Sequence, residues 1–276
     1  MGADLPNTAI GAKRLAEAEE ILGWSAIDIC QGDQDTLSKT LYTQPCLYAI
    51  EAILVDLLHD KGKSPSLVAG HSLGEYVALY AAGVFDFATG LKLVKRRAEL
   101  MDRVAGGKMA ALIGFKAEEL EKLLKETPDV VLANDNSAMQ VVISGKPEGV
   151  KAILSQIKVK KAVELPVSGA FHSPLMASAS AEFATVLQSE TFSNARVPVL
   201  CNVEPSPETN GDILKERLLQ QMTGSVRWRE TCLQLVEEGI EKVTEIGPGN
   251  VLTGLVKRTC SGLGLENIKE VAQLPA

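Results

Sequence analysis

Long apolar stretches are missing from this sequence. The longest uninterrupted run of apolar or glycine residues, Tyr76–Phe85, is far short of the about 20 residues that a membrane-crossing helix needs. No basic segment followed by an apolar one opens the chain, so we expect no secretory signal. Basic clusters are missing too, and 28 basic against 35 acidic side chains leave a net charge of −7. We therefore expect neither a membrane nor a nucleic acid as a partner.

Cysteine and histidine are also scarce. The five cysteines are odd in number and widely spaced without a C-x-x-C pair, and the three histidines are far apart. This spacing argues against a disulfide framework and against a zinc site, so we expect a reducing, cytoplasmic setting and no bound metal. The charged fraction of 23% and the aromatic fraction of 4% are those of a folded globular protein rather than a disordered chain.

What the chain does contain is an alternation of strand and helix signals, which is the pattern of an α/β fold. The expected helices are 11–22, 45–59, one that begins at Leu73, 87–104, 117–126, 147–157, 174–189, 213–222, 228–238 and 251–259. The expected strands are 67–70, 109–113, 130–133, 140–144, 162–166, 197–202 and 243–246.

Residues 108–167 form a block of their own. Their elements follow the order βαββαβ, which is the ferredoxin-like pattern. Gly106-Gly107 precedes the block and Ser168-Gly169 follows it, and both are candidate hinges. We therefore predict a ferredoxin-like small subdomain, 108–167, inserted into an α/β large subdomain made of 1–107 and 168–276.

The segment Gly70-His71-Ser72-Leu73-Gly74 fits the pattern G-x-S-x-G and lies between an expected strand and an expected helix. That context makes Ser72 a candidate nucleophile, because a serine on a tight strand-to-helix turn is exposed beside a helix N-terminus. We expect both flanking glycines to relieve clashes that a Cβ would create, and the Leu73 N–H to be one oxyanion donor. A chance match is the alternative, since the pattern is short.

A serine nucleophile needs a base, and only three histidines are available. His71 adjoins Ser72 and points away from it, and His59 ends an amphipathic helix beside charged residues. His172 follows the small subdomain in a turn-rich segment and is the base by elimination. Residue reasoning alone does not assign a third member of a triad.

Arg97 lies in the middle of the apolar arc of its expected helix, on a helical wheel of 100° per residue. A buried guanidinium must be paired, because an unpaired buried charge is too costly. Either Arg97 pairs with an internal carboxylate, or its side chain snorkels to water. The third possibility is that it binds the carboxylate of a substrate in a bidentate fork.

Together these residues resemble the malonyl-CoA:acyl carrier protein transacylases, of the acyltransferase superfamily used in fatty-acid and polyketide synthesis. The resemblance rests on Thr43-Gln44-Pro45, Gly70-His71-Ser72-Leu73-Gly74-Glu75-Tyr76, Arg97, 134–136, 141–145, Phe171-His172-Ser173-Pro174-Leu175-Met176, Asn202, Thr209-Asn210-Gly211 and Ile246-Gly247-Pro248-Gly249. It implies a hydrolase-like parallel-sheet core that carries the ferredoxin-like insert.

The resemblance also implies roles for individual residues. Ser72 and His172 would form a dyad, with the histidine oriented by the backbone carbonyl at Gln221 instead of a carboxylate. Arg97 would grip the free carboxylate of the malonyl group, and the ring of Phe171 would exclude an α-methyl branch. The remaining substrate-binding candidates are Leu73, Gln44, His71 and Asn136.

The implied reaction is a ping-pong transfer, in which a malonyl-serine forms from malonyl-CoA and passes to the phosphopantetheine thiol of acyl carrier protein. This would supply fatty-acid biosynthesis from the cytoplasm, with malonyl-CoA as substrate, no cofactor and a monomeric enzyme. An acidic carrier protein would dock on basic residues. The candidates are Lys158, Lys160, Lys161, Arg227, Arg229, Lys257 and Arg258.

One departure from the family pattern keeps alternatives open. The family begins with a strand and a loop of the form P-G-Q-G-S-Q, and nothing in this sequence matches it. The loop would supply a second oxyanion donor, whose loss costs on the order of 10²–10³ in rate. We therefore expect either a chain cut short at an internal Met or a degenerate member. A serine hydrolase with the same dyad, or a weak acyl-CoA or carrier-binding module, are the competing functions.

Overall fold

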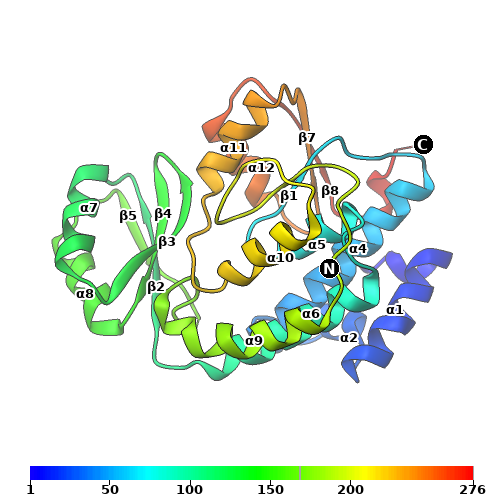
Figure 1. Cartoon of the computed structure of the whole chain (residues 1–276), viewed down its shortest axis with the longest axis horizontal. Helices are drawn as coiled ribbons and strands as arrows, with labels where there is room; N and C mark the ends of the chain where they lie inside the picture. The colour runs from blue at the N-terminus through cyan, green and yellow to red at the C-terminus, as the bar shows by residue number, and fades with distance from the viewer. Residues whose placement is uncertain (168, 276) are drawn as a thin grey trace.

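The computed structural model describes residues 1–167 and 169–275. It consists of a larger body and a smaller lobe at one side, drawn in green in Figure 1. The chain runs through the body first, enters the lobe after helix α6 (Phe87–Arg103) and then returns to the body. Strands and helices are mixed from β1 (Val68–Ala69) onward, so the predicted α/β class is confirmed.

Helices make up the N-terminal part of the body. They are η1 (Leu5–Asn7), α1 (Ala9–Leu22), α2 (Ala26–Gln31), α3 (Gln34–Leu37) and α4 (Thr40–Asp60). By length and composition alone α4 could cross a membrane, yet 61% of its apolar window is buried inside the protein. It packs against α1, α5 and α6 in the largest apolar cluster, so its hydrophobicity is that of a core helix.

Two pairs of parallel strands lie in the body. Strand β1 (Val68–Ala69) pairs with β6 (Val199–Leu200), and β7 (Lys242–Ile246) pairs with β8 (Gly264–Ile268). In the described residues the predicted parallel core therefore consists of two separate two-stranded pairs. The helices around them are α5 (Gly74–Ala81), α6, η2 (Pro174–Met176), α9 (Ala177–Ser189), α10 (Gly211–Gln220), α11 (Trp228–Glu237), α12 (Val251–Thr259) and η3 (Val271–Gln273).

The lobe has the predicted order of elements. They are β2 (Lys108–Ile113), α7 (Ala117–Glu126), β3 (Val130–Ser137), β4 (Gln140–Gly145), α8 (Pro147–Gln156) and β5 (Lys161–Glu164). The strands lie in the order β3-β4-β2-β5 with antiparallel neighbours, which is the ferredoxin-like arrangement. Helices α7 and α8 cover one face around an apolar cluster of their own. The predicted hinge residue Ser168 lies outside the described residues.

Several local features differ from the expectations. The sequence patterns did not indicate α2, α3 and β8, because elements of four to six residues are too short for a periodicity to show. Strand β3 continues to Ser137 instead of ending at 133, although its last residues are polar. Pairing with β4 across two register shifts, and a bridge from Asn134 to Val226 of the body, hold these residues in the strand.

Candidate active site

Ser72 lies on the turn between β1 and α5. Its φ of 51° is in the left-handed region, which is the strained geometry expected of a nucleophile turn. A Cβ on Gly70 would lie 1.9 Å from the Gly74 carbonyl oxygen, so the turn closes only with glycine at position 70. The same prediction for Gly74 is wrong. A Cβ there would meet nothing within 4 Å, because α5 begins at this residue and its side-chain direction leads into open space.

The His172 imidazole lies against the Ser72 hydroxyl, with 2.8 Å between Nε2 and Oγ. Its Nδ1 lies 2.9 Å from the backbone oxygen of Gln221, which is the contact that the family resemblance implied. A carbonyl only accepts, so Nδ1 carries the proton and the Nε2 lone pair faces the hydroxyl. Burial lowers the pKa of His172 to about 3, and the charge of Arg97 acts in the same direction. His172 is thus neutral near pH 7, as a general base must be.

Arg97 reaches the same place from α6, with 1% of its surface exposed. Its Nη2 donates to Ser72 Oγ and to Gln221 Oε1, each at 3.0 Å, and its Nη1 donates to Gln44 Oε1 at 2.5 Å. The guanidinium also lies over the Tyr76 ring, 5.4 Å from its centroid. Within the described residues no carboxylate lies within 4.0 Å of it, so the internal ion pair considered from the sequence is absent there. A buried cation therefore stands beside the hydroxyl with only neutral partners.

The backbone N–H groups of Ser72 and Leu73 differ in whether they have a partner. The Ser72 N–H donates to Asn202 Oδ1 at 2.7 Å, and Asn202 Nδ2 donates to the Gly70 carbonyl at 2.6 Å. The Leu73 N–H donates to no acceptor in the part of the chain that the structure describes, which suits the oxyanion role expected of it. The sequence did not predict the role of Asn202 at this turn. A polar residue two positions after the buried strand β6 was the available signal.

A family model for the acyl transferase domain matches residues 1–276 of this chain. The chain belongs to the acyl transferase domain family. The malonyl CoA-acyl carrier protein transacylase of Synechocystis sp. is 60% identical over 274 residues, 99% of this chain and 94% of the relative.

Solved structures agree with this assignment. The crystal structure of the Synechocystis malonyl-CoA:acyl carrier protein transacylase superposes on this acyl transferase with a TM-score of 0.98, at 60% identity, covering 99% of this chain and 93% of the other. A malonyl-transacylase solved in complex with a type II polyketide acyl carrier protein gives a TM-score of 0.92 at 36% identity. That alignment covers 98% of this chain and 92% of the other.

Other predicted residues of this acyl transferase lie around the dyad in two groups. Gln44 joins the Arg97 network, while His71 turns away from Ser72 and pairs with Asn136, with 2.8 Å between His71 Nε2 and Asn136 Oδ1. The His71 ring also packs on Trp228, with 5.5 Å between ring centroids. Burial lowers the pKa of His71, so it is neutral. His59 is exposed at the end of α4, as expected.

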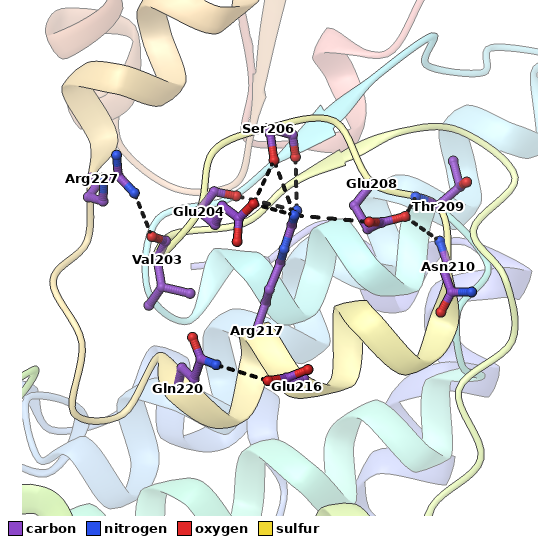
Figure 2. A network of polar contacts seen from close by, with 10 residues as sticks. All are labelled: Val203, Glu204, Ser206, Glu208, Thr209, Asn210, Glu216, Arg217, Gln220 and Arg227. Atoms are coloured by element: carbon purple, nitrogen blue, oxygen red, sulfur yellow. Dashed lines mark hydrogen bonds and ion pairs between the residues drawn. The ribbon is translucent and has the colours of Figure 1, made fainter.

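Polar contacts also join the loop that follows Asn202 to helix α10, as Figure 2 shows. Arg217 on α10 is 8% exposed and lies one helical turn before Gln221. It donates from Nη1 to the Ser206 carbonyl at 3.0 Å and from Nη2 to Glu204 Oε1 at 2.8 Å. Because that loop follows Asn202 directly, Arg217 links the segment that carries Asn202 to helix α10. The described residues contain no group of three His, Cys, Asp or Glu side chains placed to hold a metal.

Proposed function

We propose that this protein transfers a malonyl group from malonyl-CoA to the phosphopantetheine thiol of acyl carrier protein. The observation that carries the proposal is the position of Arg97, whose buried guanidinium contacts Ser72 Oγ and has no carboxylate partner within the described residues. The ester of an uncharged acyl group needs no cation at this place. The free carboxylate of a malonyl group does, and a guanidinium binds it in a bidentate fork.

In the first half-reaction the Ser72 hydroxyl attacks the thioester carbonyl while His172 Nε2 takes its proton. The Leu73 N–H stabilises the oxyanion that forms. The tetrahedral intermediate then breaks its C–S bond, and the proton held by His172 passes to the departing CoA sulfur. A malonyl ester of Ser72 remains, and no further cofactor is needed to balance the step.

In the second half-reaction the thiol of the carrier's phosphopantetheine gives its proton to His172 and attacks the ester carbonyl. The C–O bond breaks, Ser72 Oγ regains the proton and malonyl-acyl carrier protein leaves. Throughout, Arg97 holds the malonyl carboxylate and Gln44 and the Gln221 amide hold Arg97. This fixed orientation favours the incoming thiol over water.

The remaining candidates support the same reaction. We assign His71 and Asn136 to one wall of the pocket, since their mutual hydrogen bond fixes both side chains next to the turn. Phe171, half-buried beside His172, is assigned to the exclusion of an α-methyl branch. We place the reaction in the cytoplasm, where the five free cysteines would stay reduced. The monomeric state and the two subdomain ranges stay predictions.

Carrier docking on basic residues is also part of the proposal. Arg227 forms an ion pair with Glu230 and Arg229 forms one with Asp135, so both side chains already have a partner. The other candidates, Lys158, Lys160, Lys161, Lys257 and Arg258, are exposed. We expect charge reversal of these five to raise the KM for the carrier protein.

The decisive experiment uses radiolabelled malonyl-CoA and the Ser72→Ala variant. We expect the unmodified protein, and not the variant, to become labelled and to pass the label to carrier protein that bears phosphopantetheine. Carrier protein without that group is the control acceptor. A labelled serine that hydrolyses in water as fast as it transfers would instead identify a hydrolase.

A further inference from the structure

The Gln221 side chain connects Arg97, Ser72 and Glu75 through hydrogen bonds. It is fully buried, and its Oε1 accepts a hydrogen bond from Arg97 Nη2 at 3.0 Å. Its Nε2 donates to the Ser72 carbonyl at 2.8 Å and to Glu75 Oε2 at 2.9 Å. The amide must face this way round, because reversal would place its NH₂ group against the donor Arg97.

Glu75 fixes this orientation together with Arg97 and the Ser72 carbonyl. Its Oε2 accepts from Gln221 Nε2 and from the Asn202 N–H at 3.1 Å, so it bonds to two residues that both contact Ser72. A carboxylate offers only acceptors and cannot bond to a reversed amide oxygen. Glu75 takes part in no step of the proposed malonyl transfer.

Among the described residues Glu75 is buried without an ion-pair partner, and the charge of Arg97 influences its pKa. Glu75 has 0% exposure, and no cation of the described residues lies within 4.0 Å of it. Asp135 is also buried but has its own ion pair with Arg229. Burial raises the pKa of Glu75 to about 7, while the amide of Gln221 and the charge of Arg97 act in the opposite direction.

We propose that Glu75 is a positioning residue for substrate selection: through the Gln221 amide it holds the Arg97 guanidinium where a malonyl carboxylate binds. The His172 contact does not depend on this link. Its acceptor is the main-chain oxygen of Gln221, at the end of α10, where the Gln221 N–H is bonded to the Arg217 carbonyl. Glu75 therefore acts mainly on the acyl group that the site accepts, because the main-chain contact that orients the base His172 does not include it. This inference rests on the proposed malonyl transfer.

The test compares Glu75→Leu, which removes the acceptor, with Glu75→Gln, which keeps an oxygen for Gln221 and Asn202. For Glu75→Leu we expect kcat/KM for malonyl-CoA to fall about 10- to 100-fold, the range for losing a hydrogen bond that supports a charged group. Acylation by acetyl-CoA and labelling of Ser72 by a fluorophosphonate should change by less than about threefold. Glu75→Gln should restore the malonyl rate to within about threefold. If the leucine variant does not fold, Glu75→Met is the second acceptor-free variant and has the same expected result.

A matched control is Glu51→Leu on α4. Burial raises the pKa of Glu51 to about 8, and in the described residues this side chain forms no hydrogen bond with the site. We expect its malonyl-to-acetyl ratio to be unchanged. An unchanged ratio in the acceptor-free variants, an equal loss for both substrates, or failure of Glu75→Gln to restore the rate would each overturn the inference. If the unmodified protein did not accept malonyl-CoA, the proposed function itself would fall, which distinguishes the two.

Discussion

Replacing Arg97 with alanine tests how this acyl transferase selects its substrate. The guanidinium is 1% exposed and lies 3.0 Å from Ser72 Oγ, so a malonyl carboxylate bound to it is withdrawn from water. Removing one partner of a buried ion pair costs about 3–5 kcal/mol, because the other charge stays buried and unpaired. At about 1.4 kcal/mol for each factor of ten, kcat/KM for malonyl-CoA should fall about 10²–10⁴-fold.

Acetyl-CoA provides the internal reference for the same variant. Its acyl group has no carboxylate, so it loses only the hydrogen bond between Arg97 and Ser72, worth about 1 kcal/mol. The difference of at least about 2 kcal/mol predicts that the malonyl-to-acetyl ratio falls at least about 30-fold. Initial rates of CoA release, read with a thiol reagent in the presence of carrier protein, measure both substrates.

A neighbouring arginine supplies the control. Arg96 lies on the exposed side of α6 and pairs with Glu99 and Glu182. Arg96→Ala should leave the substrate ratio within about twofold of the unmodified protein, since exposed ion pairs contribute at most about 1 kcal/mol. A ratio that stays unchanged in Arg97→Ala would refute the assignment of the guanidinium to the malonyl carboxylate.

Two further results follow from the turn and the dyad. Because the pKa of His172 is about 3, labelling of Ser72 by a neutral fluorophosphonate should keep a constant rate between pH 7 and pH 5. A loss of labelling rate of tenfold or more by pH 5 would show an ordinary histidine with a pKa near 6.5. Gly70→Ala should destabilise the protein by several kcal/mol and abolish acylation, because its Cβ would lie 1.9 Å from the Gly74 oxygen. Gly74→Ala should fold and acylate normally, because its Cβ would have open space. Thermal unfolding and malonyl labelling of both glycine variants check this contrast, and equal behaviour would contradict it.

The sequence was most informative where a long periodic segment or a motif with its context was available. The amphipathic patterns placed α7 at 117–126 and α12 at 251–259, with the bounds that the structure has. The G-x-S-x-G context located Ser72, and elimination among three histidines located its neighbour His172. The position of Arg97 in an apolar arc indicated its burial, because helix geometry alone decides which face a residue occupies.

Contacts between distant segments could not be worked out from the residues in this way. The acceptor for His172 is a main-chain oxygen. Every residue has a backbone carbonyl, so the residue types do not indicate which one accepts this hydrogen bond. Its place at Gln221 came from family resemblance. The bonds of Glu75 to Gln221 and Asn202 depend on how α10 and β6 pack beside α5, which no local pattern encodes. The open space at Gly74 is likewise a property of packing.

The long sequence separations within the site have a consequence for how the protein acquires its activity. Ser72 and His172 are 100 residues apart, Arg97 and Gln221 are 124 apart, and Gln221 and Ser72 are 149 apart. Contacts between residues so far apart in the sequence form slowly, because the entropy of closing each loop is lost before the contact is made. The hairpin of β3 and β4 closes a far shorter loop. We therefore expect acyl transfer to recover late in refolding, after the secondary structure has returned.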